Sequence, residues 1–345
     1  MDEATSPAAA RRAGVREVAA LAGVSPQTVS RVINEHPYVR EETRERVNAA
    51  MAQLGFRVNN AARALGTRRT RTLGVIASNA ALFGPAAGLV ALDAAARAAG
   101  RWVATAYADA VDESSTDAAL EHLLAQGIDG VIVVAPRLGT VEALGRKHPA
   151  VTITALPSVD GVRRQQRGAR LAVDHLARLG HRRIARLGGP GDWVEEAARA
   201  DGFAEAMRTT GLETVGNWSG DWSAASGAAR AAEIGAAIRT GRGPTAVVVA
   251  NDQMALGLIA SLAADGAAVP RDVSIVGFDD NADAAYYQPA LTTVAIDVMG
   301  EASRSVADAL GLASDDVGVE VAEPRLVVRG STALDRKSTR LNSSH

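Results

Sequence analysis

The sequence contains no cysteine, few aromatic residues and no long hydrophobic run. Without cysteine the chain cannot form a disulfide framework, a cysteine-ligated zinc or iron–sulfur centre, or a thiol nucleophile. No apolar run approaches the roughly 18 residues that a membrane-spanning helix needs. The N-terminus begins with acidic residues and has no continuous apolar stretch, so it does not resemble a secretory signal. We therefore expect a cytoplasmic protein with no membrane partner.

The 345 residues are 47% hydrophobic and 22% charged, which is ordinary for a globular chain long enough for two or three domains. The formal net charge of −2 conceals an asymmetry. Residues 1–72 carry 12 basic and 7 acidic side chains, whereas residues 73–334 carry 22 and 31. A basic N-terminal part on an acidic body suggests that this part meets a polyanion, although a solvated basic face would have the same composition.

The N-terminal part shows helical periodicity. After residues 1–13, which we expect to be disordered, residues 14–58 contain three short helical pieces at 16–22, 26–34 and 41–54. Gly23 would end the first helix, and Ser25 would cap the second, whose first residue is Pro26. Residues 59–72 then hold one or two further helical turns and a basic linker.

The body, residues 73–333, alternates predicted strands and helices. The apolar runs are LGVIAS (73–78), WVATAY (102–107), GVIVVA (130–135), AVTITA (150–155), RIARLG (183–188), TAVVVA (245–250) and VSIVGF (273–278). Helical periodicity occupies 86–99, 115–126, 168–179, 195–209, 224–239 and 252–264. This alternation predicts parallel sheets covered on both faces. A stretch of this length exceeds one comfortable core, so we expect two α/β subdomains with a cleft.

The segment 15–34 meets the steric needs of a helix-turn-helix. Ala19 is small where the second helix crosses, Gly23 allows a positive φ in the turn, and Val29 and Val32 fill the space between helices. An ordinary αα-hairpin would satisfy the same needs. DNA binding is favoured because the exposed face of the second helix is polar and can donate to phosphates and base edges. Its side chains are Gln27, Thr28, Ser30, Arg31 and Asn34.

Several segments resemble one family. GVSPQTVSRVIN (23–34), EETRERVNAAMAQLGF (41–56) and NNAARAL (59–65) are similar to the head of the lac repressor family of bacterial transcription regulators. Similar segments of the body are HLARLGHRRIARLGGP (175–190), ARADGF (198–203), GDWSAASG (220–227), ANDQMALG (250–257), SIVGFDD (274–280) and QPALTT (288–293). The resemblance covers about residues 14–333.

The resemblance implies an all-α helix-turn-helix head joined to an α/β body like that of periplasmic binding proteins. That body has two doubly wound parallel-sheet subdomains. By position, the N-subdomain spans about 73–161 plus 298–321, and the C-subdomain spans about 162–297 plus 322–333.

In such heads the second helix enters the major groove. By position Pro26, Gln27 and Arg31 meet base edges, and glutamine suits adenine while arginine suits guanine. Phosphate contacts are implied for Ser25, Thr28, Ser30 and Asn34. Pro26 cannot read a base by a hydrogen bond, so operator specificity should differ from that of relatives with a longer side chain.

Residues 59–65 correspond to the family's hinge helix, which orders on operator DNA in the minor groove. Asn59 lies at its start, Ala62 lets paired hinges approach, and Leu65 corresponds to a leucine that wedges into a base step. Relatives usually carry proline where this chain has Val58. The unfolded hinge therefore loses more entropy on ordering, which should weaken it by about 0.5–1 kcal/mol.

The body is expected to bind an effector at the C-terminal ends of its strands. Polar and aromatic candidates that follow strands, and that correspond to ligand positions in the family, are Arg199, Trp222, Asn251 and Asp279. The corresponding apolar walls are Leu82, Phe83, Pro85, Ile296 and Val298. As alternatives, Asp279 could cap a turn, Asn251 could cap the helix at 252–264, and Trp222 could belong to the core.

The N-subdomain departs from the family's namesake. Ala110, Val134 and Thr154 stand where that protein has polar contacts to its sugar. The C-terminal half of the pocket is thus kept and the other half altered. A saccharide remains the expected effector, with a galactoside-like sugar as one candidate.

An enzyme is disfavoured. The histidines show no metal-ligand spacing, GGPGD (188–192) lacks both GxGxxG and a Walker lysine, and no serine nucleophile elbow is present. We expect no cofactor and no metal. Two alternatives stay open: a regulator of the same architecture with a purine or phosphorylated metabolite as effector or co-repressor, and a sugar-binding protein that does not bind DNA.

The prediction is therefore a DNA-binding repressor that meets a pseudo-palindromic operator as a homodimer, with a tetramer as an alternative. The last segment, DRKSTRLNSSH (335–345), resembles the translation of a sequencing adapter. We interpret it as an artefact and expect no structural role for it.

Overall fold

The computed structural model describes residues 13–34, 36–56, 70–109, 112–240, 242–312 and 318–335. The chain divides into two compact units, Met1–Thr70 and Arg71–His345, called here the head and the body. The predicted hinge residues Asn59, Ala62 and Leu65, the departure at Val58 and the altered position Ala110 lie outside the described residues.

The head consists of α1 (Val15–Ala22), α2 (Pro26–Ile33) and α3 (Glu41–Gln53). Gly23 ends α1 with φ 65°, a left-handed conformation that costs other residues more. Ser25 caps α2, because its Oγ accepts the Thr28 N–H at 3.1 Å. A shared core buries residues of all three helices, Val18, Ala19, Ala22, Val29, Val32, Val47 and Ala50. The predicted helix-turn-helix is confirmed.

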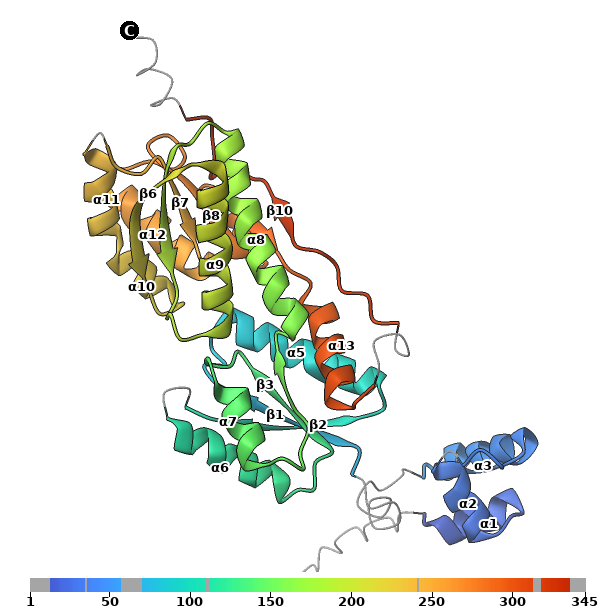
Figure 1. Cartoon of the computed structure of the whole chain (residues 1–345). Helices are drawn as coiled ribbons and strands as arrows, with labels where there is room; N and C mark the ends of the chain where they lie inside the picture. The colour runs from blue at the N-terminus through green and yellow to red at the C-terminus, as the bar shows by residue number, and fades with distance from the viewer. Residues whose placement is uncertain are drawn as a thin grey trace, which may run out of the picture. The chain divides into compact units, whose positions relative to one another are not determined.

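The body has two lobes, each built around one sheet (Figure 1). In the first lobe the strand order is β2-β1-β3-β4 and every pairing is parallel. Its strands are β1 (Thr72–Ala77), β2 (Trp102–Tyr107), β3 (Gly130–Val134) and β4 (Ile153–Leu156). Its helices are α5 (Phe83–Ala98), α6 (Glu113–Leu124), α7 (Thr140–Lys147) and α13 (Val298–Ala309).

In the second lobe the strand order is β10-β9-β8-β7-β5-β6. The strands are β5 (Arg183–Gly188), β6 (Glu213–Ser219), β7 (Ala246–Val249), β8 (Ser274–Asp279), β9 (Thr292–Ala295) and β10 (Arg325–Val327). The helices are α8 (Val159–Arg178), α9 (Val194–Thr210), α10 (Ala224–Ala229), α11 (Ala231–Arg239), α12 (Asp252–Ala264) and the short 3-10 helix η1 (Ala284–Tyr286).

The buried strands are apolar along their whole length because helices cover both faces of each sheet. In β7, Val247 and Val249 pack toward α11 and α12, whereas Ala246 and Val248 pack toward α8 and α9. Successive side chains of a strand point to opposite faces, so a strand buried on both sides needs a continuous apolar run. The fold class predicted from the sequence is confirmed.

The structure differs from the sequence prediction in several elements. The strands β6, β9 and β10 and the helices α7 and α13 were not predicted, and the single helix expected over 224–239 is interrupted at Arg230. The strand β6 is mostly exposed, and β9 and β10 span few residues, so none of the three produces a continuous apolar run. β10 pairs antiparallel with β9, unlike the all-parallel sheets expected.

The chain passes between the lobes more than once. After β4 it enters α8 of the second lobe, and after β9 it returns in α13, which packs against α5 and β4. It then reaches β10 at the edge of the second sheet. Any movement of one lobe against the other must therefore bend the segments that join β4 to α8 and β9 to α13.

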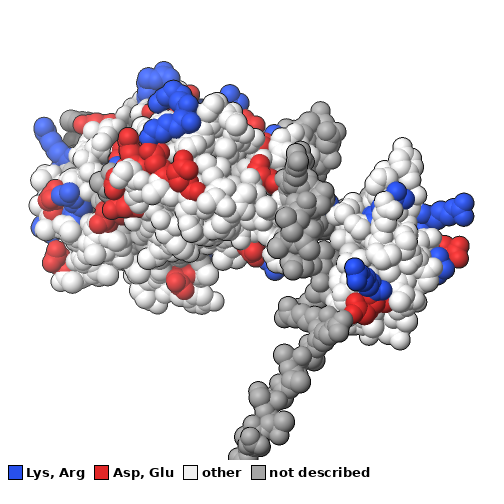
Figure 2. All heavy atoms as spheres, turned by 90° about the horizontal axis from the view of Figure 1, so that it is seen from below, with Lys and Arg blue, Asp and Glu red and all other residues white. Residues whose placement is uncertain are grey.

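The surface of the body carries scattered charge. On the face of the body seen in Figure 2, basic and acidic side chains lie in small groups separated by wide uncharged areas. None of the helices in the described ranges is long and apolar enough to cross a membrane.

Asp335 differs from the expectation for the last segment, because it is buried and its N–H donates to the Leu179 carbonyl at 2.9 Å. Residues 336–345 lie outside the described residues.

Candidate functional site

The carboxyl ends of parallel strands in the two lobes face one cavity, which residues of both lobes line. All nine effector positions predicted from the sequence line this cavity: Leu82, Phe83, Pro85, Arg199, Trp222, Asn251, Asp279, Ile296 and Val298. They come from loops and helices that are distant in the sequence. The first lobe supplies mainly apolar wall, and the second supplies most of the polar groups.

Arg199, in the second turn of α9, is held by three segments at once. Its Nε donates to Gln165 Oε1 at 2.8 Å, its Nη2 donates to Asp279 Oδ1 at 3.0 Å, and its Nη1 donates to the Ala250 carbonyl. The guanidinium also lies 3.9 Å from the centroid of the Phe278 ring. A planar guanidinium suits this bridging role, because its donors point in fixed directions.

Asp279 ends β8 in an unusual backbone conformation, with φ 107°. Two other non-glycine residues of the cavity also have positive φ, Trp222 at 75° and Ala135 at 50°. Such conformations are rare for side chains with a Cβ and collect at functional sites. Burial raises the pKa of the Asp279 carboxyl, although the charge and hydrogen bond of Arg199 act in the opposite direction.

Asn251 is a helix cap as well as a cavity residue. Its Oδ1 accepts the Met254 N–H at 2.9 Å and so caps α12, and its Nδ2 donates to the Trp222 carbonyl at 2.9 Å. The capping alternative therefore holds for this residue. Through its amide, Asn251 fixes the backbone of Trp222 at the cavity wall.

Trp222 belongs to both the core and the cavity. Its side chain is 6% exposed and meets Trp193 edge to face, with ring centroids 5.9 Å apart. Its ring covers Gly189 so closely that a Cβ there would lie 2.5 Å from it. The GGPGD loop (188–192) thus makes room for an aromatic wall.

Sequence reasoning missed other cavity residues, including Gln165, Trp193, Glu195 and Glu301. Trp193 and Glu195 lie at the start of α9, directly after the strand β5 and the GGPGD loop. Their position after a strand was a signal that could have found them. Burial raises the pKa of the Glu195 carboxyl to about 7, because it outweighs a backbone hydrogen bond and the positive charge of Arg199, which both lower the pKa.

The two altered first-lobe positions that the structure describes, Val134 and Thr154, bring no hydrogen-bonding side chain to the cavity. Val134 lines it, whereas Thr154 does not, and the Thr154 hydroxyl donates to the Val131 carbonyl at 3.4 Å. The apolar character predicted for this half of the pocket therefore follows from Val134 together with Leu82, Phe83, Pro85 and Leu156.

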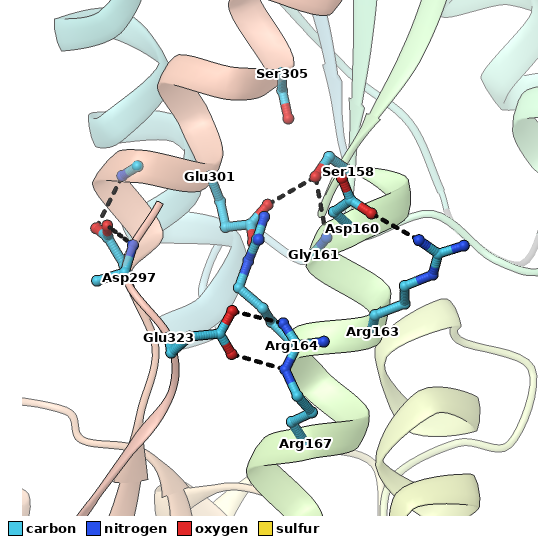
Figure 3. Close-up of polar contacts among 12 residues, drawn as sticks. Ser158, Asp160, Gly161, Arg163, Arg164, Arg167, Asp297, Glu301, Ser305 and Glu323 are labelled. Atoms are coloured by element: carbon cyan, nitrogen blue, oxygen red, sulfur yellow. Dashed lines mark hydrogen bonds and ion pairs between the residues drawn. The ribbon is translucent and has the colours of Figure 1, made fainter. Parts of the chain in front are cut away.

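Glu301 links the cavity to the segments between the lobes (Figure 3). From α13 it accepts the Ser158 hydroxyl at 2.9 Å and Arg164 Nε at 2.5 Å, so it joins the start of α8 to α13. A second ion pair, Arg167 with Glu323, joins α8 to the segment before β10. These contacts stand where the chain passes between lobes.

A buried acid, Asp252, lies behind the cavity wall. It accepts the Thr293 hydroxyl at 2.6 Å and the Asn281 N–H at 2.9 Å. Burial, followed by the negative charge of Asp279, raises its pKa to about 8. In the described ranges, no three acidic or histidine side chains gather as metal ligands would.

In the head, the residues predicted to meet DNA lie on the outer face of α2. Ser25, Pro26, Gln27, Ser30 and Arg31 are exposed, and Thr28 and Asn34 are partly buried. Thr28 Oγ1 lies 2.9 Å from Ser25 Oγ, and Asn34 Nδ2 donates to Ser30 Oγ at 3.4 Å. The opposite face packs in the core through Val29 and Val32.

Both the head and the body match known protein families. Residues 14–59 match the family described as bacterial regulatory proteins, lacI family, and residues 173–332 match the periplasmic binding protein-like domain. The chain is 35% identical over 297 residues to the lactose operon repressor of Escherichia coli (strain K12), which covers 83% of this chain and 81% of that protein.

Solved structures of two regulators are similar along almost the whole chain. The lac repressor dimer bound to operator and the anti-inducer ONPF superposes with a TM-score of 0.75 at 32% identity, covering 94% of this chain and 100% of that one. The complex of the transcriptional regulator CelR with cellobiose gives a TM-score of 0.62 at 28% identity, covering 93% and 100%.

The raised pKa of Asp252 predicts a pH-dependent stability. The folded protein keeps the Asp252 proton, so this carboxyl stabilises the fold fully below its unfolded value of 3.8 and loses that contribution as the pH rises through about 8. Asp252→Asn should flatten the decline, because its neutral amide can accept the Asn281 N–H through Oδ1 while its Nδ2 donates to the Thr293 hydroxyl oxygen. Urea unfolding midpoints of the variant and the wild type, measured across this pH range, test the prediction. Equal slopes of midpoint against pH would refute the assignment of the pH dependence to Asp252.

Proposed function

The chain belongs to the lacI family of bacterial regulatory proteins, and we propose that it is a transcriptional repressor relieved by a small saccharide. In this proposal two heads bind a pseudo-palindromic operator as a homodimer, and the saccharide occupies the cavity of the body. The observation that carries the proposal is the convergence of all nine predicted effector residues on one cavity. A DNA-binding regulator acts where the DNA is, so we assign the protein to the bacterial cytoplasm.

The exposed face of α2 supports the DNA-binding role. It offers Gln27 and Arg31 to base edges, with Ser25, Thr28, Ser30 and Asn34 near the phosphates. A single head spans one half-site, so two heads related by symmetry fit a pseudo-palindrome. The lac repressor structure that is similar to this chain is a dimer on operator, which supports the same assembly here. In that assembly Asn59, Ala62 and Leu65 would form the minor-groove hinge.

The charges of the cavity favour a neutral effector over a phosphorylated one. The guanidinium of Arg199 is already used by Asp279, Gln165 and a carbonyl, so a phosphate would have to displace these partners. Two carboxyls, Glu195 and Glu301, line the same space and would repel an anion. Two tryptophans and apolar walls suit the C–H faces of a sugar ring. CelR, a similar regulator, has been solved with cellobiose.

Occupation of the cavity can reach the head through the lobes. The walls come from both lobes, so an effector that contacts both changes the free-energy difference between their arrangements. The Glu301 contacts with Ser158 and Arg164 lie where the chain passes between lobes and adjoin the cavity. Reciprocity requires operator DNA to weaken effector binding by the same factor as the effector weakens DNA binding.

The function is tested by measuring binding of the chain, without residues 336–345, to fluorescent fragments of its own promoter region at fixed salt. We expect tight binding to one fragment and release by at least one neutral sugar in a panel with lactose, cellobiose and sugar phosphates. Release by a sugar phosphate or a purine alone would overturn the saccharide assignment. Strengthening by the ligand would make the protein a co-repressed regulator.

Arg31→Ala tests base reading by the head. Loss of a bidentate contact to guanine should weaken specific binding by roughly 1–3 kcal/mol and reduce discrimination between the operator and a scrambled fragment. Arg46→Ala removes the same charge from the exposed face of α3, where no base contact is proposed, and serves as the control. Fluorescence anisotropy on both fragments gives the ratio. Unchanged discrimination in Arg31→Ala would exclude its base-reading role.

Asp279→Asn tests the effector site. The amide keeps the shape and one acceptor beside Arg199 but removes the charge, so vicinal sugar hydroxyls lose a charge-assisted partner. We expect the saccharide concentration needed for half release of DNA to rise by about tenfold or more. Asp265→Asn, at the exposed end of α12 and outside the cavity, is the control. An unchanged response would remove Asp279 from the site.

A further inference from the structure

Two buried polar atoms in the cavity have no hydrogen-bond partner among the described residues. They are Oε2 of Glu195, which can accept, and Nε1 of Trp222, which can only donate. Both atoms are inaccessible to solvent in this structure. A buried polar group without a partner costs free energy, and such groups in native proteins call for a physical explanation.

The other polar groups of the cavity have partners. Arg199, Asn251 and Asp279 make the contacts described above, and Glu301 is shared by Ser158 and Arg164. These groups build the wall and are already satisfied within it. Glu195 and Trp222 are different, because each lines the same cavity and carries one buried polar atom without a hydrogen-bond partner among the described residues.

A purely structural role for Glu195 would be to place a negative charge at the positive N-terminus of α9. The next residue, Glu196, already does this from a buried position. It pairs with Arg186 at 2.6 Å and accepts the Gly189 N–H at 2.8 Å. Of two adjacent acids in the same helical turn, one is fully bonded in the fold and the other lines the cavity.

We propose that Glu195 is a specificity-determining residue of the cavity, which accepts a hydrogen bond from a hydroxyl of the bound effector while Trp222 Nε1 donates to an effector oxygen. This inference rests on the proposed function and names the polar groups that the effector must present. Glu195 and Trp222 need not contact the same oxygen, because a sugar ring carries several.

Glu195 Oε2 accepts a hydrogen bond and Trp222 Nε1 donates one, and this difference selects the chemistry of the ligand. A hydroxyl both donates and accepts, so a polyhydroxylated ring satisfies Glu195 and Trp222 together. An ammonium only donates hydrogen bonds and would leave Trp222 Nε1 without an acceptor. A phosphate only accepts them and would leave Glu195 Oε2 without a donor. Burial raises the pKa of Glu195 to about 7 even though a backbone hydrogen bond and the positive charge of Arg199 both act to lower it. A partly neutral acid suits a neutral hydroxyl better than an ion.

The test measures sugar binding directly and needs no DNA. The whole chain, Glu195→Ala, Glu195→Gln and the control Glu205→Ala are titrated with lactose, cellobiose and o-nitrophenyl galactoside by calorimetry. Glu205 lies on the exposed face of the same helix, outside the cavity. We expect Glu195→Ala to bind the sugar at least about tenfold more weakly. Glu195→Gln, which keeps an acceptor, should stay within about threefold, and Glu205→Ala should match the wild type.

A mutant cycle with monodeoxy analogues of the sugar that binds identifies the hydroxyl. One analogue should lose affinity for the wild type but bind Glu195→Ala no more weakly than the parent sugar does. Losses that simply add for every analogue would overturn the contact with Glu195. Equal affinity of Glu195→Ala and wild type would also overturn it and leave the saccharide assignment standing.

The two proposals fail in different ways. If the wild type binds no neutral sugar but binds another class of ligand, the proposed effector class fails, and this inference fails with it. Circular dichroism of Glu195→Ala checks that its fold is intact. If the alanine variant does not fold, the conservative variant Glu195→Gln, which keeps size and shape, is used instead. A loss of sugar affinity of tenfold or more in Glu195→Gln would contradict a role of Glu195 as a simple acceptor.

Discussion

The cavity between the two lobes depends on one buried guanidinium. Arg199 joins α8, the segment after β7 and the end of β8 through Gln165, Ala250 and Asp279, and it lies against the Phe278 ring. Removing one member of such a buried pair leaves an unpaired charge and costs about 3–5 kcal/mol. The wall around Arg199 is therefore fixed before any ligand arrives. A preorganised wall of this kind lowers the entropy that binding must overcome.

Around this wall, most polar groups have hydrogen-bond partners within the fold, and a few buried polar atoms have none among the described residues. Glu196 and Glu301 are satisfied by arginines, whereas Glu195 and the Trp222 indole are not. The first lobe adds apolar surface, because Val134 lines the cavity and Thr154 donates its hydroxyl to a carbonyl. Discrimination among sugars should therefore come from the second lobe, and the first lobe should contribute shape.

The same cavity adjoins the passages of the chain between the lobes. Glu301 lines it and also holds the start of α8 against α13, so the ligand site and the bending segments share a residue (Figure 3). A conformational change needs a ligand that interacts differently with two arrangements, and walls from two lobes meet this requirement. This geometry makes the body suitable as a sensor for a DNA-binding head.

The sequence by itself determined the three helices of the head, the turn at Gly23, the cap at Ser25 and the strands with continuous apolar runs. These features follow from local sterics and periodicity, and the resemblance to a family supplied the nine cavity residues. Only the tertiary structure decided that β10 runs antiparallel, that α13 returns to the first lobe, and that both oxygens of Glu196 have partners while Oε2 of Glu195 has none among the described residues. Two adjacent glutamates look alike in a sequence. Their partners come from distant segments, so only the packed chain distinguishes a structural acid from one that faces a ligand.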